Sequence, residues 1–158
     1  NLERGTTLEL AGGYTLDYDF AGLGAITSSG NTLTASGTFT PGFANEIGTL
    51  SVDNLDFRGQ INWEFAAPDS CDVIACDNLS FGEGAAKTIT ALWTGDGEPV
   101  PGSYPVFTYH GTAPAFNLAE WTVNRPRGMT AELRHDNASK MVVLDITEAP
   151  SSLLIILR

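Results

Sequence analysis

The sequence predicts an all-β protein, built as a parallel β-solenoid whose short coils stack on one another and end in an antiparallel cap. Glycine, threonine and serine are abundant, which favours short strands joined by tight turns. No stretch keeps apolar residues at helical spacing for three turns. A strand–turn–strand pattern also recurs along the chain at a nearly constant offset, which is typical of a repeat architecture.

The repeat is clearest in two segments that align without gaps. Residues 50–57 read LSVDNLDF and residues 74–81 read IACDNLSF, and a looser copy, LTASGTF, occupies residues 33–39. A period of about 20 to 25 residues suits one coil of a β-solenoid. We interpret the Asp-Asn and Ser-Gly pairs as breaks where the chain turns a corner, because these residues tolerate left-handed backbone conformations.

Alternation of apolar and polar residues within the repeat predicts which side chains face the core. The inward set is Leu50, Val52, Leu55, Phe57, Ile74, Cys76, Leu79 and Phe81. Asn54 and Asn78 would then lie on top of each other at one corner and hydrogen-bond along a ladder. The alternative is a pair of unrelated strand–turn–strand hairpins with similar turns.

The remaining strands are expected in a regular order. Short strands should occupy residues 7–10, 14–18 and 23–26, and longer ones residues 85–94, 104–110, 120–124, 129–134 and 140–147, with a hairpin connection at 135–139. We therefore expect a single domain over residues 1–158, with coils over about 1–95 and capping strands, including a C-terminal strand, over about 96–158. A cap is required because an open last coil exposes unpaired backbone groups.

The chain is strongly acidic, and its charge is unevenly distributed. The formal net charge is −11, with −12 in residues 1–124 and +1 in residues 125–158. An acidic surface repels phosphate groups, so we expect no nucleic acid partner. The uneven charge favours head-to-tail contact between copies, while plain solvation of the surface is the simpler interpretation.

A short apolar run lies at the C-terminal end of the sequence. It consists of Leu153, Leu154, Ile155, Ile156 and Leu157. Five residues are too few to cross a bilayer, so we expect no membrane span and assign the run to one strand. Together with the apolar stretch Leu8–Leu16, it could add to the sheet of a neighbouring chain, which predicts self-association through the terminal strands.

Two cysteines, Cys71 and Cys76, lie five positions apart. In an extended chain their Cα atoms are separated by about 16 Å, well beyond the disulfide limit of about 7 Å. A disulfide therefore requires residues 72–75 to bend back, and it would fit an oxidising compartment. The competing interpretation is a free Cys76 buried in the core. A zinc site is not expected, because His110 and His135 are distant from this pair.

Three segments follow one another in an order that resembles a known family. They are residues 36–52 (SGTFTPGFANEIGTLSV), residues 62–81 and residues 102–146. In this order they resemble the C-terminal end of autotransporter-like β-helix passengers, and the first segment is similar to the motif P-G-x-S-x-G-T-L-x-V without its serine. The resemblance implies a right-handed parallel β-helix, secreted or on the bacterial cell surface, that serves adhesion or architecture. Residues 147–158 are similar to a truncated Pro-Glu-Pro surface-sorting tail.

Carboxylates are plentiful, but they form no recognisable catalytic motif. Asp53 and Asp77 would lie on adjacent coils about 4.8 Å apart, close to the carboxyl separation of retaining glycosidases. Repeat-equivalent acids are more commonly solvated or act as Ca²⁺ ligands. A polysaccharide-degrading enzyme would also need a base in an acid cluster, and neither Arg58 nor Lys87 lies in one. We therefore predict that the protein is not an enzyme and needs no cofactor. Ca²⁺ is the one ion that could bind.

Aromatic residues supply the remaining candidate site. Trp93 and Trp121 could stack against sugar rings of a host or matrix glycan, although such residues more often belong to the core. The sequence thus predicts a non-enzymatic extracellular structural or adhesive protein, with self-assembly into a surface filament through the terminal strands. The alternatives are a carbohydrate-binding module and, second, a polysaccharide-degrading β-helix enzyme.

Overall fold

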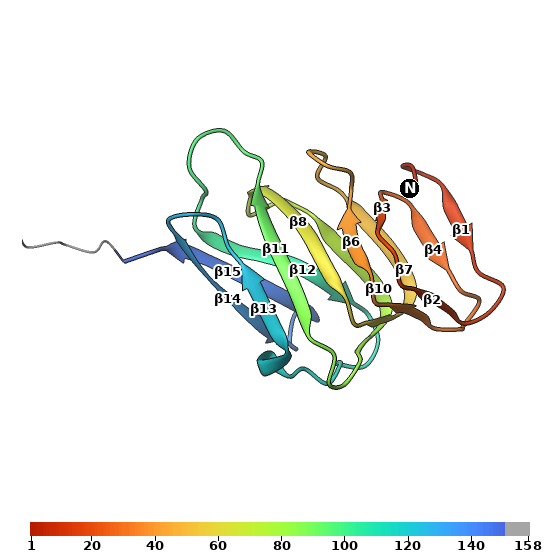
Figure 1. The fold of residues 1–158 in the computed structure, drawn as a ribbon. Coiled ribbons are helices and arrows are strands. Elements are labelled where there is room, and N and C mark those ends of the chain that lie inside the picture. Colours follow the sequence, from red (N-terminus) through yellow and green to blue (C-terminus); the bar gives the residue numbers. More distant parts are fainter. Residues whose placement is uncertain (151–158) are drawn as a thin grey trace, which may run out of the picture.

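The computed structural model describes residues 1–150, which form an all-β fold with one short 3₁₀ helix, η1 (Leu118–Glu120). The strands belong to two sheets that pack on a common core (Figure 1). Buried apolar residues from both sheets make up a single cluster. Among these residues there is no helix with the length and apolar character that a membrane crossing requires.

The larger sheet has nine strands. They are β1 (Thr7–Glu9), β2 (Tyr14–Leu16), β4 (Ala25–Thr27), β5 (Leu33–Ala35), β7 (Thr49–Phe57), β10 (Val73–Phe81), β12 (Gly102–Tyr109), β14 (Met129–Asp136) and β15 (Met141–Glu148). Pairing is parallel from β1 and β2 through β4, β5, β7 and β10 to β12. It becomes antiparallel where β12 meets β15 and where β15 meets β14.

The smaller sheet has six strands. They are β3 (Phe20–Gly22), β6 (Thr38–Pro41), β8 (Gln60–Ala67), β9 (Ser70–Cys71), β11 (Lys87–Trp93) and β13 (Trp121–Asn124). The path β3–β6–β8–β11–β13 is parallel throughout, and only β9 pairs antiparallel, with β8. Along the sequence, the chain passes back and forth between the two sheets.

The register of β7 and β10 confirms the predicted repeat. Ile74 pairs with Leu50 and Leu79 pairs with Leu55 on parallel neighbouring strands, which is the same offset as in the gapless alignment of the two segments. All eight residues predicted to face inward are buried. The alternative interpretation, two unrelated hairpins, is therefore wrong, because the two segments pair directly with each other along their whole length.

The two asparagines of the repeat lie side by side as predicted, but not at a corner. Asn54 and Asn78 pair in register, and β7 and β10 run without a break through both. Burial explains the difference: the inward positions skip from Val52 to Leu55, so two successive residues face outward. Because β10 has the same skip, the strands change phase together and keep their pairing.

The predicted Ser-Gly break is a true corner, because Ser36-Gly37 connects β5 in one sheet to β6 in the other. The next turn of chain has Arg58-Gly59 at the equivalent place, between β7 and β8. A Cβ on Gly59 would lie 2.1 Å from the carbonyl oxygen of Gly37. Successive corners thus stack too closely to admit a side chain, which explains glycine at this place.

Most of the longer strands lie where the sequence predicts them, and the hairpin connection between β14 and β15 falls in residues 137–140. Parallel pairing, however, continues past the expected boundary at about residue 95. β12 pairs in parallel with β10, and β13 pairs in parallel with β11. The antiparallel part of the fold is therefore essentially the β12–β15–β14 segment of the larger sheet.

Candidate functional site

The first strands leave one end of the described structure with unpaired edges. Figure 1 shows β1, β2 and β3 at the end opposite to β14 and β15. Among residues 1–150, β1 pairs only with β4, β2 only with β5, and β3 is the last strand of its sheet. Such edges present backbone donors and acceptors to which another strand can add.

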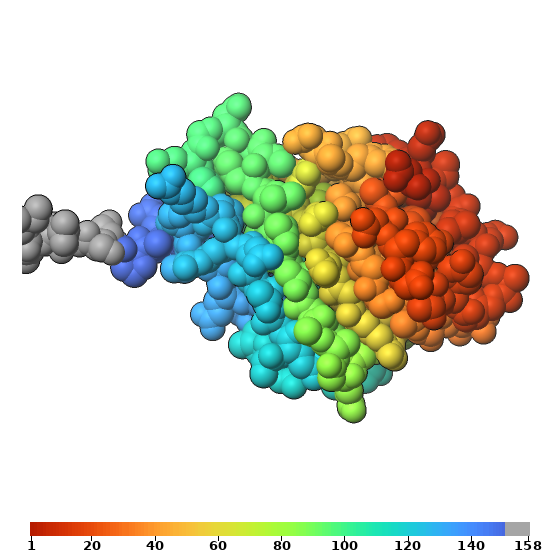
Figure 2. Space-filling view, in the orientation of Figure 1, coloured from red at the N-terminus to blue at the C-terminus, as the bar shows by residue number. Residues whose placement is uncertain are grey.

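Large apolar side chains are exposed at the same end, which forms one extremity of the space-filling view (Figure 2). Leu8, Tyr14 and Tyr18 are 37%, 47% and 54% exposed, and they are half of the large apolar residues exposed in the described part of the chain. The two tyrosines lie close together, since a hydrogen bond with Tyr14 raises the pKa of the Tyr18 hydroxyl. We call this end, formed by β1 and β2 with these three side chains, the N-terminal edge.

Part of this end is already covered by the chain itself. The Leu2 amide donates to the carbonyl of Ala21 at 3.0 Å, and the Leu23 amide donates to the carbonyl of Leu2 at 2.9 Å. Leu2 therefore pairs with Gly22 at the end of β3. A Cβ on Gly22 would lie 2.7 Å from the Cβ of Leu2, so glycine permits this contact. The edges that remain open are those of β1 and β2.

The opposite end of the larger sheet is an antiparallel hairpin rather than an open parallel strand. Arg134 on β14 donates from Nε to Asp145 on β15 at 2.6 Å and from Nη1 to Asp136 at 3.3 Å. These exposed ion pairs neutralise the arginine across the hairpin. The predicted assembly strand (Leu153, Leu154, Ile155, Ile156 and Leu157) lies outside the described residues.

The two tryptophans proposed for glycan stacking both pack against the core. Trp93 contacts Phe65 with ring centroids 5.2 Å apart, and its indole donates to the carbonyl of Gly97 at 3.1 Å. Trp121 stacks on Phe57 at 6.1 Å and on Phe116 at 5.9 Å. Both side chains are partly buried, so most of each ring is committed to internal packing. Because Trp121 pairs with Lys87 at the other end of β11, the two rings do not form one platform.

Both cysteines are buried free thiols in the structure. Cys71 lies on β9 in the smaller sheet and Cys76 on β10 in the larger sheet. Burial, with smaller contributions from Asp72 and Asp69, raises the pKa of Cys71 to about 12. Burial also raises the pKa of Cys76. Both thiols therefore stay protonated and poorly nucleophilic at neutral pH.

A shallow groove of about 210 Å³ across β4, β7 and β10 of the larger sheet contains Asp53, Asp77 and His110. Burial acts to raise the pKa of Asp53, but hydrogen bonds from Ser28 and Asn54 outweigh it, and the pKa is lowered. Both Asp53 oxygens accept from Ser28 at 2.8 Å, and Asp77 pairs with His110 at 3.1 Å. Each acid thus has its own hydrogen-bond partner. Within residues 1–150 there is no cluster of three or more Asp, Glu, His or Cys side chains that could hold a metal ion.

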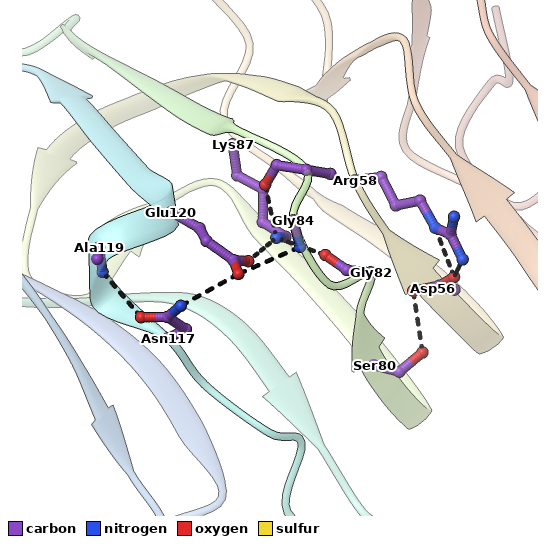
Figure 3. Close-up of polar contacts among 10 residues, drawn as sticks. Asp56, Arg58, Ser80, Gly82, Gly84, Lys87, Asn117, Ala119 and Glu120 are labelled. Atoms are coloured by element: carbon purple, nitrogen blue, oxygen red, sulfur yellow. Dashed lines mark hydrogen bonds and ion pairs between the residues drawn. The ribbon is translucent and has the colours of Figure 1, made fainter.

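Figure 3 shows Lys87, which the sequence presents only as a base outside any acid cluster, paired with Glu120. Lys87 is fully buried, and its Nζ donates to Glu120 Oε2 at 2.7 Å and to the carbonyls of Gly82 and Ala85. Glu120 borders a pocket of about 400 Å³ that is also lined by Phe81 and Phe116. The strand pattern carried a signal for Lys87, because it alternates in phase with the inward Ile89.

Two buried acids were missed by sequence reasoning. Glu64 on β8 is 4% exposed, and Asp72, between β9 and β10, is fully buried. Oε2 of Glu64 is the one buried side-chain polar atom in the described residues that lacks a hydrogen-bond partner. Glu64 directly follows the inward-facing Trp63, so strand alternation predicts that Glu64 faces outward. It is nevertheless buried, because a chain segment from elsewhere in the sequence covers it.

Comparisons with protein families, with curated proteins and with solved structures find no match to this chain. Two candidate sites stand out by their geometry. The N-terminal edge combines unpaired backbone groups with exposed apolar side chains, and the pocket beside Glu120 combines aromatic rings with acids.

Proposed function

We propose that this protein is a non-enzymatic, extracellular structural or adhesive module that joins a second copy of itself through the N-terminal edge. The observation that carries the proposal is the coincidence of unpaired edges on β1 and β2 with exposed Leu8 and Tyr14 on those same strands. Strand addition satisfies the backbone groups while side chains of this kind are buried against the added strand.

The finer fold assignment belongs to the same proposal. The chain passes repeatedly between two mostly parallel sheets, and the repeated segments pair in register as β7 and β10. Both features support a parallel β-solenoid, and the resemblance to autotransporter-like passengers supports a right-handed β-helix on a bacterial cell surface. The repeats of a solenoid stack on their neighbours, so an open strand edge can accept a further strand.

Backbone direction shows which groups of β1 are available. The Leu10 amide donates to Thr27, and the Thr6 carbonyl accepts from Ala25, so even-numbered residues of this strand bond to β4. In a parallel ladder the residues between them point their amides and carbonyls the other way. Thr7 and Glu9 therefore offer the free edge to which a partner strand would bond.

Charge favours a head-to-tail arrangement of copies. Residues 1–24 carry four acids and one base, a net charge of −3, while residues 125–150 carry four of each and are balanced. Two N-terminal edges would repel each other, but an N-terminal edge facing the other end of a second copy would not. Contact of this heterologous kind continues from copy to copy and builds fibres.

The test is the molar mass of the protein in solution across a concentration series, measured by light scattering on a sizing column, with electron microscopy of the largest species. We expect masses above the 16.8 kDa of one chain. Glu9→Pro should return the protein to a monomer, because it removes a free edge amide without removing a bond to β4. Leu8→Lys should weaken assembly as well.

The matched control is Leu118→Lys, which places the same charge on a comparably exposed leucine in η1, away from the edge. It should leave the mass distribution unchanged, and thermal unfolding should show that every variant is folded. A wild-type chain that stays monomeric at all concentrations would refute assembly through the N-terminal edge. Equal effects of Leu8→Lys and Leu118→Lys would show that charge alone is responsible.

A carbohydrate-binding role is the second candidate, supported by the pocket beside Glu120. Its lining combines the rings of Phe81 and Phe116 with the polar groups of Glu83 and Asn117, a mixture that suits the faces and hydroxyls of a sugar. Phe116→Ala should abolish binding on a glycan array, whereas Trp93→Ala should not. An array without any bound glycan would remove this candidate.

A further inference from the structure

Two carboxyl groups lie together beneath the turn that connects β6 to β7. Glu64 donates its amide to Asp72 Oδ2 at 2.9 Å, and the Asp72 amide donates to the Glu64 carbonyl at 2.8 Å. The indole of the fully buried Trp63 donates to the Asp72 carbonyl at 2.5 Å. The backbone therefore holds the two acidic residues side by side.

Each carboxyl also holds one part of the turn. Glu64 Oε1 accepts from the amide of Asn45 at 2.8 Å, and Asp72 Oδ1 accepts from the amide of Gly48 at 2.9 Å. Asn45 has a left-handed backbone with φ of 66°, and Ala44, Asn45 and Glu46 are exposed, so the turn covers the acids from the solvent side. Residues 43–48, which we call the cover turn, are thus attached to the body of the protein by two carboxyl groups and by the Val73 amide, which donates to the Gly48 carbonyl at 3.0 Å.

The pair has no cationic partner within the described residues. Arg4, the base nearest to the cover turn, pairs with Glu46 at the surface at 3.5 Å rather than with a buried acid. The other ionisable groups of the surrounding segments are Asp69, which is acidic, and Cys71, which stays a neutral thiol. Two carboxylates without a buried cation are costly in an apolar environment, and the unpartnered Oε2 of Glu64 adds to that cost.

A single proton removes most of this cost. Burial raises the pKa of Asp72 to about 7, and the charge of Glu64 adds to the increase, although hydrogen bonds from Glu64 and Gly48 oppose it. Like charges in a shared site usually keep one proton between them for this reason. The proton is then lost near neutral pH, and both acids become charged under the cover turn.

We propose that Glu64 and Asp72 form a proton-dependent latch: one proton on the pair keeps the cover turn closed, and its loss releases the turn. Glu64 can lower the repulsion by moving toward solvent through the exposed part of the turn. That movement breaks the bond from the Asn45 amide. The latch is independent of the proposed assembly, because it lies in the β6–β7 connection and not at β1 or β2.

The experiment follows the carboxyl carbons of Glu64 and Asp72 by ¹³C NMR, together with hydrogen exchange of the Asn45 and Gly48 amides, between pH 5 and 9. One carboxyl of the wild-type pair should titrate near pH 7. After correction for the intrinsic rate, protection of the Asn45 amide should fall at least tenfold as the proton is lost. The Gly48 amide should keep its protection, because its bond to Asp72 favours the charged carboxylate. Glu64→Gln, which is neutral and keeps an oxygen for Asn45, should make the protection of the Asn45 amide independent of pH.

Glu46→Gln is the matched control, since it neutralises an exposed acid on the same turn, and it should leave the wild-type pH dependence intact. Titration of both buried carboxyls below pH 5 in the wild-type protein would overturn the latch, and this measurement needs no variant. A loss of pH dependence in Glu46→Gln would overturn it too. Calcium chloride that restores protection at pH 8 in wild type, but not in Glu64→Gln, would identify a cation site instead.

Discussion

The Nζ of Lys87 lies 2.7 Å from Oε2 of Glu120, and the lysine is fully buried while the glutamate side chain reaches solvent. The pair connects β11 to η1, two elements that the sequence separates widely. The hydrogen bond from Lys87 is the main reason why the pKa of Glu120 is lowered. This ion pair fixes the wall of the pocket that contains Phe116.

The first prediction concerns this ion pair. Glu120→Gln leaves a buried ammonium without its counterion, so the free energy of unfolding should fall. Lys87→Met replaces the charge by an apolar chain of similar length and should cost less. Chemical denaturation of the three proteins checks the order. A smaller loss in Glu120→Gln than in Lys87→Met would show that the buried charge is not the dominant contribution.

The second prediction concerns the asparagine ladder. Asn78 Nδ2 donates to Asn54 Oδ1 at 2.8 Å on the outer surface of β7 and β10. Asn78→Ala should reduce the free energy of unfolding by about 1 kcal/mol, since a neutral and partly exposed hydrogen bond contributes little. A double-mutant cycle with Asn54→Ala measures the coupling directly. Strictly additive losses would mean that the two side chains do not interact in solution.

The third prediction concerns the thiols. Because burial raises the pKa of Cys71 to about 12 and covers Cys76, neither should react with a thiol reagent at pH 8 in the folded protein. In denaturant without reductant, both should react at once. Recovery of no free thiol under those conditions would instead show that the cysteines are joined by a disulfide.

The fourth prediction is the dependence of stability on pH. The pKa of Asp72 in the folded protein, about 7, lies above the usual value of 3.8, so the folded state holds the extra proton between these values. The free energy of unfolding should therefore fall as the pH rises from about 4 to 7, by at most about 4 kcal/mol.

Below pH 4 the sign reverses, because the pKa values of Asp53, Glu120 and Asp136 are lowered and their contribution is lost on protonation. Thermal melts across this range should show maximal stability in mildly acidic solution. Glu64→Gln should reduce the decline between pH 4 and 7 only in part, because burial is the main cause of the raised pKa of Asp72 and the charge of Glu64 a lesser one. Glu46→Gln should leave the decline unchanged. A stability that rises steadily from pH 4 to 7 in the wild-type protein would contradict the assignment.

The fifth prediction concerns the stacked corners. Gly59→Ala places a Cβ 2.1 Å from the carbonyl of Gly37, and backbone must move to accept it. We expect a loss of about 2 to 4 kcal/mol. Gly12→Ala is the control, because nothing lies within 4 Å of its added Cβ. It should be neutral or stabilising by up to about 1 kcal/mol. Equal stability of the two variants would argue against stacked corners.

Local patterns predicted much of the fold. Strand alternation placed Leu50, Val52, Leu55 and Phe57 in the core, because side chains on a strand alternate between its two faces whatever the strand packs against. The repeat also predicted that Asn54 and Asn78 would meet, since equivalent positions in successive copies lie in register when the copies stack.

The sequence by itself therefore determined the strand content, the inward faces and the stacking of the two clearest repeats. Only the tertiary structure decided that Lys87 has a counterion in Glu120, that Trp93 and Trp121 pack internally, and that Glu64 and Asp72 are covered together. The physical reason is that alternation is a property of one strand and its neighbour. Burial of a charge or a ring depends on which distant segment closes over it, and no local pattern records that segment.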